Sequence, residues 1–162
     1  MTAVADQLVT PAAFREAISH HAAGVAVVTT DGPDGPAGVT ISSLTSHSVE
    51  PPTLSCNLAT ASATLTAIRW RRRFAVHLLA DTQADLATHF AGRAPDRFTG
   101  TVWTWWEGLP KLPDVVTSFA CDLLTEVAVG DHAIILGTVS AATASPSQRP
   151  LVYQRRDFHH IA

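Results

Sequence analysis

The stretch that decides the fold runs from Gly38 to Thr64 and reads GVTISSLTSHSVEPPTLSCNLATASAT. It joins two strand-like runs through a turn at Pro51–Pro52 and ends in a loop of small residues, 62–64. It contains no acid–base pair and no metal-ligand spacing. It offers small hydroxyl side chains and backbone N–H groups between apolar strands. Such a surface is suited to a flat aromatic ligand that carries a phosphate tail.

The loop at Ser62 precedes a segment that predicts a short helix, residues 64–70, because apolar residues stand at Leu65 and Ile68. Ser62 is a natural N-cap for this helix. The start of a helix presents unpaired N–H groups and a partial positive charge, so it can bind a phosphate. A serine that merely caps a surface helix is the commoner case, so both interpretations stay open at this point.

Composition narrows the class of protein. The chain has 162 residues, a length typical of one domain, and 46% of them are hydrophobic. A net charge of −3 indicates no basic surface for nucleic acid. Charged residues make up only 15% of the chain, below the usual quarter, which leaves little polar surface to cover a monomer. We therefore expect a subunit interface.

The cysteines and the N-terminus indicate the compartment. Cys56 and Cys121 stand in apolar strand-like runs, so we expect buried free thiols and no disulfide framework. Residues 1–7 lack the basic and apolar regions of a signal peptide. No run approaches the ~18 apolar residues of a membrane span. The sequence therefore predicts a cytoplasmic protein without membrane contact.

Short apolar runs and turn residues dominate the rest of the chain. The strands predicted from these runs cover residues 25–30, 37–41, 53–58, 74–79, 118–129 and 131–139. Helices are predicted from Pro11 to Gly24 and over residues 64–70 and 82–90. Two prolines in the turn at residues 31–36 exclude a Gly-x-Gly-x-x-Gly nucleotide loop, which requires a strand, a glycine turn and a helix. This pattern suits an antiparallel barrel with appended helices.

Several short motifs, in their order and spacing, resemble the flavin reductase family, the small flavin:NAD(P)H oxidoreductases of two-component monooxygenases. The motifs are Thr40-Ile41-Ser42-Ser43, Ser48-Val49-Glu50-Pro51-Pro52, Asn57, Ser62-Ala63-Thr64, Asp96-Arg97-Phe98, Gly130-Asp131-His132 and Pro150-Leu151-Val152-Tyr153. The resemblance implies one domain over residues 1–162, with a core at about 14–153. It implies a mainly β fold with flanking helices, an antiparallel Greek-key split β-barrel of FMN-binding type. It also implies a homodimer with flavin near the subunit interface.

The same resemblance implies the residues of the site. The flavin-binding residues that it carries over are Val39, Thr40, Ile41, Ser42, Ser43, Cys56, Asn57, Ser62, Ala63, Thr64, His77, Gln83, Phe90 and Arg97. His132 would lie near the nicotinamide as the candidate catalytic residue, and Tyr153 would assist it. The implied cofactors are FMN or FAD, with NADH or NADPH as hydride donor. The sequence departs from the family at His77, where asparagine is usual, and in lacking a glycine after Tyr153.

For several of these residues a plain structural role stays open. Gln83 could cap the helix over residues 82–90, Arg97 could pair with a carboxylate, and His132 could be an ordinary turn residue. The tryptophans at positions 103, 105 and 106 form either a stacking platform or packing over a dimer seam. The arginines between positions 69 and 73 form either a solvated helix end or a contact with a nucleotide phosphate.

The lack of an acid–base pair agrees with flavin reduction, because the cofactors carry that chemistry and the protein supplies binding and orientation. We expect the chain to transfer hydride from NAD(P)H to FMN or FAD and to supply reduced flavin to a partner monooxygenase. Two alternatives are a non-catalytic flavin- or nucleotide-binding split-barrel protein and a pyridoxamine-phosphate-oxidase-like enzyme. The eight histidines form no pair with cysteine or carboxylate at zinc-like spacing, so we expect no metal site.

Overall fold

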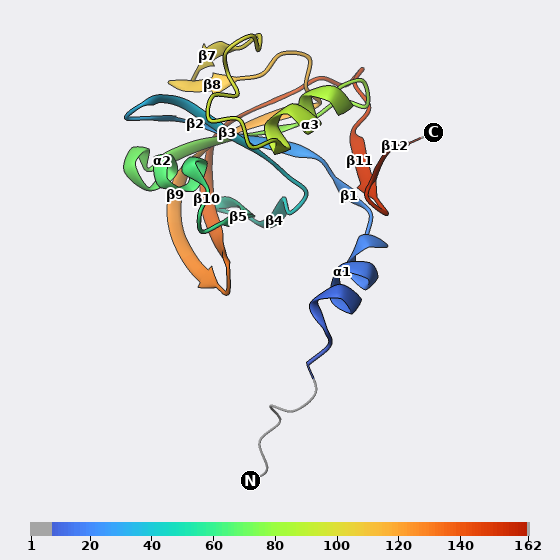
Figure 1. Cartoon of the computed structure of the whole chain (residues 1–162). Coiled ribbons are helices and arrows are strands. Elements are labelled where there is room, and N and C mark those ends of the chain that lie inside the picture. The colour runs from blue at the N-terminus through green and yellow to red at the C-terminus, as the bar shows by residue number, and fades with distance from the viewer. Residues whose placement is uncertain (1–7, 162) are drawn as a thin grey trace.

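A seven-stranded antiparallel sheet forms the body of the molecule in the computed structural model, which describes residues 8–161 (Figure 1). The strands are β2 (Ala26–Gly32), β3 (Gly35–Ile41), β4 (Thr45–Val49), β5 (Pro52–Ala59), β6 (Arg73–Leu78), β9 (Thr117–Val129) and β10 (His132–Ala144). Their order in the sheet is β3-β2-β6-β9-β10-β5-β4. Residues 1–7, where we expected no signal peptide, lie outside the described residues.

Smaller elements surround this sheet. A three-stranded sheet contains β1 (Ala23–Gly24), β11 (Leu151–Gln154) and β12 (Asp157–His160), and β7 (Thr104–Trp106) pairs with β8 (Leu109–Lys111). The helices are α1 (Pro11–Ser19), α2 (Ala63–Arg71) and α3 (Ala84–Ala91). Figure 1 shows α1 projecting from the body next to β1, whereas α2 and α3 lie against the large sheet.

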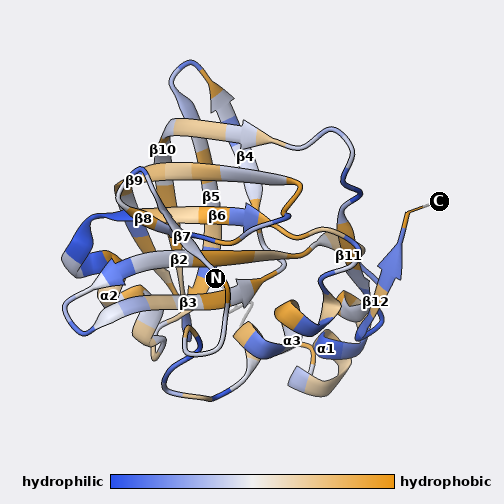
Figure 2. Cartoon of the chain, turned by 90° about the horizontal axis from the view of Figure 1, so that it is seen from above, coloured by the Kyte–Doolittle hydropathy of each residue, from blue (hydrophilic) through white to orange (hydrophobic). Residues whose placement is uncertain are grey.

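Strand β2 is buried because each of its two faces packs against a core cluster. Ala26 and Val28 belong to one core cluster, which includes Phe74. Val27 belongs to a second cluster, which includes Phe90 of α3. A continuous run of buried β-branched residues is typical of a strand that is covered on both faces. In Figure 2 the large sheet carries much of the hydrophobic colour, whereas the outer strand β12 is largely hydrophilic.

The predicted strands and helices are confirmed apart from their ends, whereas the short strands β1, β4, β7, β8, β11 and β12 were not predicted. The helix predicted from Pro11 ends at Ser19 instead of Gly24, because Gly24 and its neighbour Ala23 pair with β11. Thr10 begins this helix as its N-cap, and its side chain accepts a hydrogen bond from the Ala13 N–H at 3.2 Å. The mainly β, antiparallel fold class is confirmed.

The tryptophans lie in or beside the β7–β8 hairpin. Trp103 packs edge-to-face against Phe98 and Trp105, with ring centroids 5.6 and 5.0 Å away. The Lys111 ammonium lies 5.0 Å from the centroid of Trp106. Because these rings pack on one another and on a cation, the structure favours a packing role over a stacking platform for a ligand.

Arg69, in the last turn of α2, and Arg73, just after the helix, each pair with a carboxylate. Arg69 donates to both carboxylate oxygens of Glu126, at 3.0 and 2.5 Å, and this pairing lowers the pKa of Glu126. Arg73 Nε donates to Asp122 Oδ1 at 2.8 Å. These pairs favour the interpretation of a solvated helix end over a phosphate contact for Arg69 and Arg73.

The two cysteines are free and buried, as expected. Burial raises the pKa of the Cys121 thiol to about 12 and raises the pKa of Cys56 as well, so both stay protonated and unreactive. Within residues 8–161, no helix is both long and apolar enough to cross a membrane.

Candidate functional site

A hollow of about 490 Å³ lies where the end of β3 meets β5 and the start of β10. We call it the main hollow. Its lining residues are Val39, Thr40, Ile41, Ser42, Ser43, Asn57, Leu58, Ala59 and His132. Seven of these nine residues are candidate site residues from the sequence, so the structure brings that part of the prediction together. Leu58 and Ala59 were missed, although Ala59 follows the exposed Asn57 by two positions and therefore shares its face of the strand.

Two contacts create this hollow. Strands β5 and β10 pair with His132 opposite Ala59, which brings the Gly-Asp-His turn beside β5. Strands β3 and β5 are not neighbours in the sheet order, yet the Asn57 N–H donates to Ser43 Oγ at 2.9 Å. The sheet therefore curls until the end of β3 reaches β5, and a side chain joins the two where no strand ladder exists.

The hydroxyl groups of the main hollow differ in whether they already form hydrogen bonds within the protein. Thr40 Oγ1 donates to the carbonyl oxygen of Ala87 in α3 at 2.7 Å, so this hydroxyl hydrogen is engaged. Ser43 Oγ bonds to Asn57. Ser42 is exposed, and its hydroxyl has no hydrogen bond within residues 8–161. Ser42 is thus the hydroxyl best able to bond a ligand.

His132 lines the hollow with its side chain about half exposed. Its Nδ1–H donates to Asp131 Oδ1 at 2.7 Å, and this bond lowers the pKa of Asp131. A histidine that donates through one ring nitrogen keeps the other nitrogen for a second partner. His132 is therefore an oriented group at the rim of the hollow, with its other ring nitrogen left for a second partner.

The start of α2 has the features of an anion site. Ser62 stands at the N-cap with extended backbone, but its side chain makes no capping hydrogen bond. The first helical bond runs from the Thr66 N–H to the Ser62 carbonyl oxygen at 3.2 Å, so the N–H groups of residues 63–65 have no acceptor inside the helix. The Ser62 hydroxyl and these N–H groups can together hold a phosphate.

Thr64 corrects part of this prediction. Its side chain is only 1% exposed, so its hydroxyl cannot reach a phosphate in solvent, and only its backbone N–H remains available. Ala63 is exposed and contributes its backbone alone. The helix needs Thr64 as a buried residue of its inner face, next to Leu65 and Ile68.

His77 is a further correction, because the structure buries it completely. Its Nδ1 lies 2.9 Å from Ser118 Oγ, and its Nε2 lies 3.0 Å from both Thr29 Oγ1 and the Pro110 carbonyl oxygen. Burial lowers the pKa of His77 to about 4, so the ring is neutral near pH 7. With both nitrogens engaged inside the protein, His77 offers nothing to a flavin and instead ties β8 to the large sheet.

The side chains of Cys56 and Phe90 are also fully buried. Cys56 belongs to the first core cluster and Phe90 to the second. Neither side chain has surface to offer a ligand, so both leave the candidate site. The sequence prediction failed here because Cys56 of β5 and Phe90 of α3 both face the core instead of the solvent.

The side chains of Gln83 and Arg97 form hydrogen bonds with backbone groups of the protein. Gln83 Oε1 accepts from the Ala80 N–H at 2.9 Å, and its Nε2 donates to the Pro113 carbonyl oxygen at 2.9 Å. Arg97 donates to the carbonyl oxygens of Gly38 and Gly92, at 2.6 and 2.5 Å. Within residues 8–161 Arg97 pairs with no carboxylate, and its bond to Gly38 holds it against β3.

A second hollow, of about 370 Å³, shares Thr40, Ile41 and Ser42 with the main hollow. We call it the side hollow. Its other lining residues are Val25, Ala87, Thr88, Ala91, Tyr153, Arg156 and Phe158. Tyr153 and His132 therefore line two different, adjoining hollows. Arg156 and Phe158 were not predicted from the sequence.

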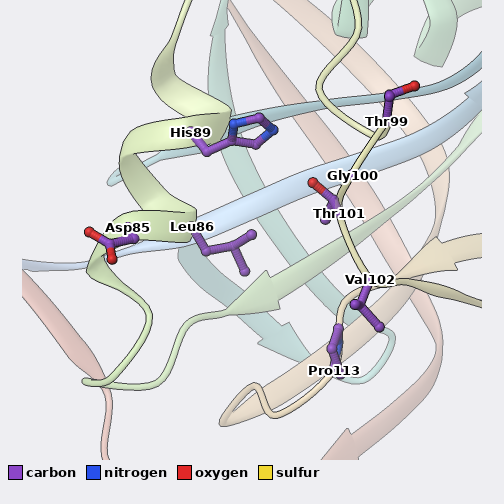
Figure 3. Close-up of a pocket in the computed structure, with 8 residues that line it drawn as sticks. All are labelled: Asp85, Leu86, His89, Thr99, Gly100, Thr101, Val102 and Pro113. Carbon is purple, nitrogen blue, oxygen red and sulfur yellow. The ribbon is translucent and has the colours of Figure 1, made fainter.

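A third hollow, of about 340 Å³, contains none of the predicted residues. Figure 3 shows it between α3, which contributes Asp85, Leu86 and His89, and the loop of residues 99–102. His89 Nε2 already bonds to the Arg97 carbonyl oxygen at 2.8 Å. Since this hollow brings an acidic side chain and few free donors, it fits an anionic cofactor less well than the main hollow does.

The chemistry of the main hollow fits a flavin. It is lined by hydroxyl, amide and imidazole groups and by apolar side chains, and no carboxylate of the part of the chain that the structure describes lines it. A cavity of this size is within the range of small-molecule sites. A flavin ring has polar edges and an apolar face, which this lining matches, and the start of α2 supplies anion donors for a phosphate.

The fold and the site together define an antiparallel split barrel with a place for a flat ring and an anion. The chain belongs to the flavin reductase family, because the family model described as "Flavin reductase like domain" matches residues 18–162. It is 37% identical over 153 residues to FMN reductase (NADH) RutF 1 of Methylorubrum extorquens, a match that covers 93% of this chain and 76% of that protein.

Solved structures show the same likeness. SgcE6, an NADH:FAD oxidoreductase of Streptomyces globisporus C-1027 solved in complex with NAD and FAD fragments, has a TM-score of 0.89 and 30% identity, covering 96% of this chain and 97% of that one. The styrene monooxygenase flavin reductase SMOB of Pseudomonas putida S12 has a TM-score of 0.84 and 31% identity, covering 92% and 97%. The split-barrel expectation is thereby confirmed.

Proposed function

We propose that this chain is an NADH-dependent flavin reductase that passes reduced flavin to a separate oxygenase. The observation that carries the proposal is the grouping of Ser42, Ser43, Asn57 and His132 around one hollow. The names of the relatives support it, because RutF 1 is an FMN reductase that uses NADH and SgcE6 is an NADH:FAD oxidoreductase. The styrene monooxygenase component supports an oxygenase as the partner.

The protein's part is to bind and align. The free hydroxyl of Ser42 bonds the polar edge of the ring, and Ser43 and Asn57 keep the end of β3 fixed against β5. A bound flavin supplies the atom that accepts hydride from the dihydronicotinamide, so no acid–base pair is required of the chain. Holding both rings in a reactive stack contributes much of the rate enhancement.

His132 is the residue that we propose to contact the nicotinamide. Its Nδ1 is held by Asp131, so Nε2 is the nitrogen that meets the hydride donor. At the other end of the flavin, the Ser62 hydroxyl and the N–H groups of residues 63–65 hold the phosphate. These roles predict that the donor and the phosphate tail are recognised by different residues.

Steady-state oxidation of NADH with added FMN or FAD tests this function, and NADPH in place of NADH tests the donor. We expect turnover with NADH and either flavin. If the protein binds flavin in a titration but oxidises neither NADH nor NADPH, it is a non-catalytic flavin-binding protein instead. Oxygen uptake with pyridoxamine phosphate, without NADH, would favour the oxidase alternative.

We also propose that the chain acts as a homodimer. Helix α1 buries none of its residues, and its Phe14 and Ile18 are more than half exposed. Such apolar surface on a projecting helix suits contact with a second copy. Sedimentation velocity is expected to give twice the chain mass of 17.2 kDa, and a single monomer peak at micromolar concentration would contradict it. The cytoplasmic location stays a prediction.

A further inference from the structure

The turn between β11 and β12 holds two arginines in an unusual backbone conformation. Gln154 pairs with Asp157, so Arg155 and Arg156 alone form the turn. Their φ angles are +52° and +65°. Two-residue turns with positive φ at both positions favour Asn-Gly, because a side chain is disfavoured in the left-handed region. Strained residues of this kind persist where the surrounding structure or a function requires them.

Arg156 lies at the rim of the side hollow and, among residues 8–161, is the one charged residue that lines it. Next to it stand Tyr153 and Phe158, whose rings pack with their centroids 5.5 Å apart. The side hollow adjoins the main hollow through Thr40 and Ser42. A ligand that extends out of the main hollow therefore meets an apolar, aromatic wall that ends in one guanidinium.

The present partner of Arg156 is weakly held. Arg156 Nη2 donates to Glu16 Oε2 of α1 at 3.1 Å, and both side chains are more than 60% exposed. Exposed ion pairs contribute little to stability, so this arginine can exchange its carboxylate for another anion. Because α1 buries none of its residues, such an exchange disturbs no core.

We propose that Arg156 binds the diphosphate of a nucleotide whose reactive ring lies in the main hollow. Guanidinium groups pair with phosphate through two parallel hydrogen bonds, which makes arginine the usual choice for such anions. The ligand of the proposed function that carries such a diphosphate is the pyridine dinucleotide, because the phosphate of the flavin is placed at the start of α2. The proposal rests on the proposed function and adds a residue that selects for the nucleotide part of the ligand.

The test replaces Arg156 with glycine, which removes the charge and suits the positive φ, so that the fold is retained. Arg156→Lys keeps the charge without the bidentate geometry. The control is Arg155→Gly, because Arg155 shares the turn and the positive φ but does not line the side hollow. The melting temperatures of all variants are measured beside the KM values for NADH, FMN and FAD.

Arg156→Gly is expected to raise KM for NADH by about 10-fold with FMN as acceptor, with KM for FMN and FAD unchanged. A rise in KM for FAD alone, with KM for NADH level, would overturn the proposal. The Arg156→Lys variant is expected to have a KM for NADH between that of the unmodified protein and that of Arg156→Gly. Unchanged KM values for all three ligands in a folded Arg156→Gly variant would overturn the proposal.

A second variant acts in the opposite direction. Glu16→Gln removes the carboxylate that competes for Arg156, so the same KM is expected to fall two- to threefold at low ionic strength. A rise in that KM would overturn the proposal. Failure of the underlying function is recognised separately, because the unmodified protein would then fail to oxidise NADH with any flavin.

Discussion

The Asn57 N–H donates to the Oγ of Ser43 at 2.9 Å, and this bond joins the end of β3 to the middle of β5. No strand ladder connects these two strands, since β3 and β5 are separated by four other strands in the sheet order. The contact between these two strands at the main hollow is therefore made by the side chain of Ser43. Ser43 acts as a positioning residue for the flavin-binding surface that we propose.

Ser43→Ala is expected to loosen this junction. Removing one partner of a hydrogen bond costs about 1 kcal/mol of stability, and the solvent exposure of Asn57 keeps the loss at the lower end. We expect a several-fold weaker Kd for FMN in a fluorescence titration. Ser48→Ala, on the exposed strand β4, is the control. Equal FMN affinity in both variants would contradict the role of Ser43.

Ser62→Ala is expected to weaken the binding of FMN about 10-fold while leaving the binding of riboflavin almost unaffected, because only FMN carries the phosphate. The variant should fold normally, since the Ser62 side chain makes no capping bond. Isothermal titration with both ligands measures the difference. The matched control is Thr66→Ala on the exposed side of the same helix. An equal loss for FMN and riboflavin would place the phosphate elsewhere.

His77 predicts a particular dependence of stability on pH. Burial lowers its pKa from 6.5 to about 4, so the unfolded chain takes up a proton over this interval and the folded protein does not. The contribution of neutral His77 is therefore complete above pH 6.5 and is lost as the pH falls towards 4. Between pH 7 and pH 5 this one group should reduce the free energy of unfolding by about 2 kcal/mol.

The variant His77→Asn separates this effect from other titrating groups. It should be about 1–3 kcal/mol less stable than the parent at pH 7, because Ser118 and the Pro110 carbonyl lose a partner. Its stability should then fall less than that of the parent between pH 7 and pH 5. Urea denaturation at both pH values measures this, with the exposed His159→Gln as control. Parallel losses in parent and His77→Asn would refute the assignment.

Gly38 allows α3 to approach β3 closely. A Cβ on Gly38 would lie 2.8 Å from Cε1 of Phe90 and 3.2 Å from the Val28 carbonyl oxygen. Gly38→Ala should therefore destabilise the protein by about 1–3 kcal/mol through overpacking. Adding Phe90→Leu should recover part of the melting temperature, because it removes the ring from that space. A double variant that is less stable than the sum of the single variants would argue against this contact.

The sequence was sufficient for the fold and for part of the site. Alternation and turn residues predicted the strands, and the resemblance to the family named Ser42 and Asn57, both of which are exposed in the structure. The grouping with His132 followed from the resemblance, and the pairing of His132 with Ala59 accounts for it physically.

The errors have one physical origin. His77 and Cys56 stand in strands whose burial depends on which elements later cover them, and hairpin β7–β8 covers His77 with a carbonyl from Pro110. Nothing local to either strand specifies that cover. Gln83 and Arg97 each bond one nearby backbone group and one that is distant in the chain, at Pro113 and Gly38, and the distant partners cannot be read from spacing.

The central claim is that the main hollow holds a flavin in position for reduction by NADH. The most direct measurement is the rate at which the yellow absorbance band of FMN disappears when NADH is added without oxygen, with and without the protein. We predict that the protein accelerates the loss of the band by orders of magnitude and that Ser42→Ala and His132→Ala slow it. A rate with the protein equal to the rate without it would contradict the account.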